Sequence, residues 1–150
     1  MDSLSALQRR LGHRFANSAL LTRALTHRSA GAEHNERLEF LGDAVLQTAI
    51  SALLYERFGG SDEGDLTRVR AHLVREDSLA RVALAIGLPD VLRLSEGEAR
   101  GGGAQRPSIL ADCVEALIGA PVRSLRSVSS LCLKATICST WVLRKGLPFV

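Results

Sequence analysis

The chain has 150 residues, a length that fits one domain with a hydrophobic core of its own. Hydrophobic residues make up 46% and charged residues 23%, as in an ordinary globular protein, which excludes a disordered or collagen-like chain. Charged residues interrupt every apolar run before the ~18 residues that a membrane span needs, and no signal-peptide pattern follows Met1. The sequence therefore predicts a cytoplasmic protein with no membrane partner.

The net charge of +3 is distributed unevenly. Residues 1–120 hold all sixteen acidic residues and fourteen arginines, whereas residues 121–150 hold five basic residues and no acidic one. From Pro121 onward serine and cysteine also become frequent. We therefore expect a folded domain over residues 1–120 and an atypical basic tail over residues 121–150 that packs poorly. The three cysteines, Cys113, Cys132 and Cys138, match neither a zinc nor a disulfide pattern.

Apolar residues at helical spacing, together with turn signals, predict helices and no strand. A glycine-rich segment near residues 97–105 is expected to form a mobile loop. The pattern as a whole predicts an all-α helical bundle. The expected helices cover residues 3–11, 18–25 (capped by Asn17), 33–58 (ended by Gly59 and Gly60), 65–75 (capped by Asp65), 76–86 and 107–120.

Acidic residues cluster on two of these helices. At ~100° per residue, Glu36, Glu39 and Asp43 share one narrow stripe of the long helix, and Asp112 and Glu115 lie together on the last one. Carboxylates gathered in this way suit a hard cation such as Mg²⁺. Amphipathic helices with solvated acidic faces give the same pattern, so spacing alone leaves both interpretations open. The expected core face of the long helix consists of Leu38, Leu41, Val45, Ala49 and Leu53.

Two further residues of the long helix stand out. Phe40 lies beside the acidic stripe and off the core face, either as an isolated surface aromatic or as a knob inserted into a partner subunit. Gly42, in mid-helix, costs roughly 1 kcal/mol relative to alanine, which indicates the close approach of another backbone or a tolerated glycine. His27 and His34 lack metal-ligand spacing and are interpreted as structural or surface histidines.

The segment His34–Leu46, HNERLEFLGDAVL, resembles the signature of the ribonuclease III catalytic domain. ALTHRS at 24–29, DEGDLT at 62–67 and SILADCVEALIGA at 108–120 are similar to that family's other motifs, in the same order. The resemblance covers about residues 4–120. It implies an all-α homodimer that cleaves double-stranded RNA with metal-activated water and Mg²⁺, or Mn²⁺, as cofactor, in the processing of rRNA, tRNA and mRNA precursors.

The motifs also imply roles for single residues. Glu39, Asp112 and Glu115 are implied to ligate the metal, and Asp43 with Glu115 to be catalytic. Phe40 is implied to be the dimer knob. The supporting acids, at the site and the subunit boundary, are implied to be Glu36 and Glu63.

Two departures from the family pattern qualify the resemblance. The family commonly has an acidic residue where Pro107 stands. After Ala120 the sequence does not match the family's usual continuation or its double-stranded-RNA-binding domain. A change of reading frame would produce such an abrupt difference. The alternative is therefore a nuclease-like module that dimerises or holds RNA with little or no cleavage. A di-iron bundle is disfavoured because its Glu-x-x-His pair is missing.

Overall fold

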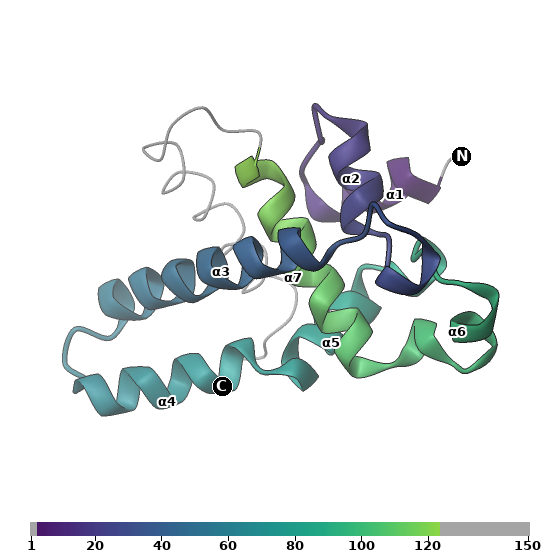
Figure 1. Ribbon diagram of the computed structural model, residues 1–150. Helices are drawn as coiled ribbons and strands as arrows, with labels where there is room; N and C mark the ends of the chain where they lie inside the picture. Colours follow the sequence, from purple (N-terminus) through teal and green to yellow (C-terminus); the bar gives the residue numbers. More distant parts are fainter. Residues whose placement is uncertain (1–2, 124–150) are drawn as a thin grey trace.

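The computed structural model describes residues 3–123, and this part of the chain contains helices and no strand (Figure 1). The predicted all-α fold is confirmed. The tail at residues 124–150, with Cys132 and Cys138, lies outside the described residues. The elements are α1 (Ser3–Leu11), α2 (Ser18–Ala24), η1 (Arg28–Ala30), α3 (Glu36–Arg57), α4 (Glu63–Val74), α5 (Glu76–Ala85), η2 (Leu88–Asp90), α6 (Glu96–Arg100), η3 (Gly103–Gln105) and α7 (Pro107–Arg123).

Several boundaries differ from the sequence-based predictions, among them the start of α3 at Glu36 instead of residue 33. Asn17 caps α2 as expected, but α4 is capped by Asp62, whose side chain accepts a 2.8 Å hydrogen bond from the backbone N–H of Asp65. The segment predicted as a mobile loop forms α6 and η3, because Ser95 caps α6 by accepting from the N–H of Glu98. Finally, α7 does not end at Ala120 but continues through Pro121.

The centre of the fold is the crossing of α3 and α7 (Figure 1). Each helix places a glycine at the contact. A Cβ on Gly42 would overlap the backbone carbonyl of Glu115, and a Cβ on Gly119 would overlap that of Leu38. The two backbones therefore touch directly, which settles the open question about Gly42 in favour of close approach. Helix α5 packs against α7, and α4 runs back beside α3.

The buried face of α3 is rotated from the one predicted. Leu41 and Leu53, expected in the core, are only half-buried. The rotation follows from the contact at Gly42, which points this side of α3 at α7. Helix α3 also has the length and hydropathy of a marginal membrane span, but its buried side forms the protein core. The buried residues of α3 are Leu38, Gly42, Val45, Leu46, Ala49, Ile50 and Leu54.

Candidate metal centre

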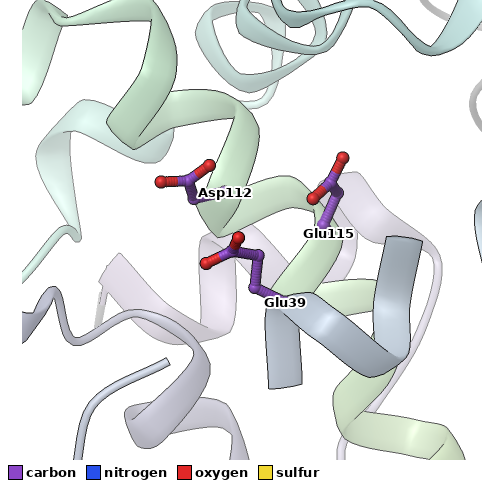
Figure 2. A group of neighbouring side chains, drawn as sticks. All are labelled: Glu39, Asp112 and Glu115. Carbon is purple, nitrogen blue, oxygen red and sulfur yellow. The ribbon is translucent and has the colours of Figure 1, made fainter. Parts of the chain in front are cut away.

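Three carboxylates meet at the edge of the α3–α7 crossing. Glu39 comes from the first turn of α3, and Asp112 and Glu115 come from consecutive turns of α7 (Figure 2). One carboxylate oxygen from each residue lies within 4.8 Å of the other two, and all three residues are half-buried. The set offers only oxygen ligands, which suits Mg²⁺ or Mn²⁺ better than a soft transition metal.

The electrostatics of this acidic group also fit a cation. Partial burial raises the pKa of Glu115 to about 7, and the charges of Asp43, Glu39 and Asp112 add to the rise. Burial likewise raises the pKa of Glu39 and that of Asp112, again with help from neighbouring carboxylates. Within residues 3–123 none of the three forms an ion pair with a basic side chain. No ion pair within these residues offsets the mutual repulsion, and a divalent cation would relieve it.

The other predicted acids lie around or away from this group. Asp43 is exposed one turn further along α3 and accepts a 3.3 Å hydrogen bond from Gln47. Glu36 is exposed and pairs with Arg28 at 3.4 Å. Glu63 begins α4, at the opposite end of the α3–α4 hairpin, where it accepts a 2.8 Å hydrogen bond from Thr67. One copy of the chain thus gathers Glu36, Glu39, Asp43, Asp112 and Glu115, but not Glu63.

Two further side chains, which the sequence analysis did not assign to the site, lie beside the acidic group. His27 and Arg28 both lower the pKa of Asp112, and Arg28 also lowers that of Glu39. His27 caps η1 and Arg28 is its first residue, and no spacing rule connects them to residues 39 or 112. The motif ALTHRS contained both residues, but nothing in its pattern indicates the direction of their side chains.

Phe40 projects from the side of α3 that faces away from α7. Its residue surface is 81% exposed, so it does not belong to the core of the single chain. Ala44, Thr48 and Tyr55 are exposed on the same face, and this face carries no charged residue between Phe40 and Phe58. A groove beside Phe40 is lined by Leu20 from α2 and by Leu38 and Leu41 from α3, among other residues.

The comparisons with known proteins agree with this arrangement. The family model described as Ribonuclease-III-like matches residues 17–123, a segment that includes every member of the acidic group. The chain belongs to the ribonuclease III family. Its relationship to Ribonuclease 3 of Albidiferax ferrireducens is close, with 64% identity over 119 residues, which are 79% of this chain and 52% of that protein.

Solved structures show the same ribonuclease III nuclease fold. The nuclease domain of ribonuclease III from Campylobacter jejuni superimposes with a TM-score of 0.90 at 37% identity, covering 100% of this chain and 99% of that one. A second structure of that domain, concerned with flexibility in a region involved in dimer formation, gives a TM-score of 0.88 at 38% identity over 95% and 97% of the two chains. The chain spans about half the length of the curated relatives it matches, and the matched part is the nuclease domain.

Proposed function

We propose that this nuclease domain is a divalent-metal-dependent endoribonuclease that hydrolyses double-stranded RNA. The observation that carries the proposal is the meeting of Glu39, Asp112 and Glu115 within 4.8 Å on two touching helices. The relatives named Ribonuclease 3 support it, because the aligned segment contains all three residues. Processing of RNA precursors in the cytoplasm is the cellular role that membership of this family favours.

Each acidic residue has a part in the proposed reaction. Glu39, Asp112 and Glu115 would hold Mg²⁺ or Mn²⁺. When bound, the metal neutralises the phosphate charge and lowers the pKa of a water nucleophile. Asp43, exposed beside Glu115, would accept a hydrogen bond from that water and so orient it. Glu36 and Glu63 are proposed as supporting acids, with Glu63 reaching a site only from a second copy.

The proposed assembly is a homodimer formed through the uncharged face of α3. Phe40 is largely exposed and lines a groove in which Leu20, Leu38 and Leu41 lie among charged residues such as Arg23 and Arg37. Large exposed aromatic side chains of this kind bind best in a pocket of a partner. A dimer would carry two acidic groups, one for each strand of an RNA duplex.

Cleavage of long RNA duplexes tests the activity. The purified chain is incubated with the duplex in Mg²⁺, and we expect discrete fragments that disappear with a chelator. Single-stranded RNA of the same length should survive. Intact duplex in Mg²⁺, together with measurable RNA binding, would instead favour the alternative of a binding or dimerisation module.

Variants of the acidic group test the assignment of roles. Glu115→Gln and Asp43→Asn are expected to reduce cleavage by at least about a hundredfold, in line with the loss of a group that stabilises the transition state. Glu56→Gln, an exposed acid further along α3, is the matched control and should cleave at the wild-type rate. Wild-type cleavage by Glu115→Gln would contradict the proposed metal site.

A further inference from the structure

We propose that His27 and Arg28 form a phosphate-binding wall on one side of the acidic group and contact the RNA backbone directly. The inference rests on the proposed function, because it names the part of the protein that holds the anionic substrate of that same site. It concerns residues outside the carboxylate set. Its basis is the hydrogen bonding of the segment that carries them.

The segment before η1 is held rigidly from two directions. On one side it forms an isolated parallel bridge between Thr26 and Arg93, in which His27 N–H donates to the Arg93 carbonyl at 3.0 Å. On the other side the backbone N–H of Asn35 donates to the Thr26 carbonyl at 2.9 Å, just before α3 begins. The buried side chain of Asn35 also donates to the carbonyl of Ala24 at 3.3 Å. His27 and Arg28 therefore have a fixed position relative to α3.

The imidazole of His27 is oriented by its own turn. Its Nδ1 accepts a 3.2 Å hydrogen bond from the backbone N–H of Ser29 and lies 2.9 Å from the Ser29 hydroxyl. That hydroxyl oxygen in turn accepts from the N–H of Ser95 at 3.1 Å. An acceptor at Nδ1 places the proton of the neutral ring on Nε2. His27 thus presents an N–H donor at the far end of its ring.

Arg28 is the second residue of this phosphate-binding wall, and its guanidinium is available to pair with a substrate phosphate. Its side chain is 70% exposed, and its contact with the site runs through the 3.4 Å pair with exposed Glu36. Exposed pairs of this kind contribute only about 0–1 kcal/mol, so a phosphate competes for the guanidinium at little cost. A guanidinium also matches phosphate geometry with two parallel hydrogen bonds.

Charge balance explains why such a wall is needed. The acidic group with Asp43 carries more negative charge than one divalent cation neutralises, and an RNA duplex is itself a polyanion. A phosphate that approaches the site therefore needs positive or donor groups that belong to the protein. His27 and Arg28 supply them beside Glu36 and Asp112.

Paired substitutions separate substrate contact from a structural role. His27→Asn keeps a short acceptor that can cap η1 but removes the distal N–H, whereas His27→Gln keeps a distal N–H and gives up the local acceptor. Arg28→Ala removes the guanidinium, and Arg68→Ala removes an exposed arginine on α4 that pairs with Asp65. Circular dichroism checks the folding of each variant.

Binding is measured by fluorescence anisotropy with an end-labelled RNA duplex in Ca²⁺, over a range of KCl concentrations, with the duplex checked for integrity. We expect Arg28→Ala to raise Kd about tenfold and to reduce the slope of log Kd against log salt by about 0.7–0.9, the value for one phosphate contact. His27→Asn should raise Kd about tenfold, as for a lost hydrogen bond to a charged group, with His27→Gln within about threefold of wild type. Arg68→Ala should bind as wild type.

Two results would overturn the inference. One is equal RNA affinity of Arg28→Ala and Arg68→Ala. The other is impaired binding by His27→Gln with normal binding by His27→Asn, which would show that His27 serves only as a cap. Calorimetry of Mn²⁺ binding without RNA should give wild-type affinity for every variant, and a parallel loss of metal and RNA affinity would also count against direct contact.

Wild-type cleavage in Mg²⁺ is followed separately on the same duplex. Absence of cleavage with the expected pattern of Kd values would refute the proposed function and leave the inference standing. Cleavage by the wild type with unchanged Kd values in all variants would refute the inference alone.

Discussion

The two faces of α3 differ in packing and exposure. The face toward α7 is closely packed, and Gly42 there allows backbone contact that brings Glu39 next to Glu115. The opposite face, with Phe40, Ala44, Thr48 and Tyr55, is exposed and uncharged. Substitutions on the first face should therefore change the folded monomer and its metal site, and those on the second should change assembly.

The largest effect is expected at the helix crossing. Gly42→Ala should lower the free energy of unfolding by about 3 kcal/mol, because the added methyl group overlaps the Glu115 carbonyl and forces α3 and α7 apart. The same separation should weaken metal binding. Chemical denaturation with and without Mg²⁺ measures both effects.

Gly97→Ala in α6 is the control for this prediction, because an added Cβ there meets no atom within 4 Å. It should be neutral or slightly stabilising, by up to about 1 kcal/mol. Equal stability of the two variants would mean that the crossing relaxes easily and that the contrast between the two faces is weaker than the geometry indicates.

On the exposed face, Phe40→Ala should raise the dissociation constant of the dimer about tenfold to a hundredfold, as for a central aromatic residue in an interface. The helical content should not change, since Phe40 contributes little to the monomer core. Sedimentation equilibrium measures the association, and Leu84→Ala, a half-exposed apolar residue on α5, serves as the control. A loss of helicity instead would place Phe40 in the core.

The smallest effect is a dependence of stability on pH. The pKa of Glu115 is raised to about 7, so folding favours its protonated form. Its contribution is fully present below the unfolded pKa of about 4.5 and is lost as pH rises toward 7. In the absence of metal, Glu115→Gln should therefore gain about 1 kcal/mol over the wild type between pH 5 and pH 8, after allowance for solvent at this half-buried group.

Magnesium should reverse this order of stability. Ionised carboxylates bind the cation, so Mg²⁺ should stabilise the wild type at pH 8 and release protons, with little effect on Glu115→Gln. Thermal unfolding at several pH values, with Mg²⁺ or with chelator, measures the difference. Parallel stability curves for the two proteins would show that Glu115 ionises normally.

The sequence predicted the elements of the site better than their directions. Residue spacing placed Glu39, Asp112 and Glu115 on two helices. The sides on which these helices face each other are set by the contact between Gly42 and Gly119, and these two glycines are distant in the sequence. The same dependence explains why Leu41 and Leu53, predicted to be core residues, are only half-buried. Hydrophobic periodicity shows how wide an apolar stripe is, but it fixes the orientation of that stripe around the helix axis only to within about one residue.

His27 illustrates a second limit of sequence reasoning. Its orientation depends on a serine two residues away and on the backbone near Ser95, which is brought close only by folding. The short helix α6 was missed for a related reason, because its glycines indicate a loop, whereas Ser95 supplies a cap for the N–H of Glu98.

The hydrogen bond between Ser29 and Ser95 has a consequence for the order of folding. It joins residues 66 positions apart, and the neighbouring bridge between Thr26 and Arg93 spans a similar stretch of chain. Closing a loop of that length is slow relative to forming the local helices within it. The rim of the acidic group should therefore form late, so a nascent or partly refolded domain can hold its helices well before it can bind RNA.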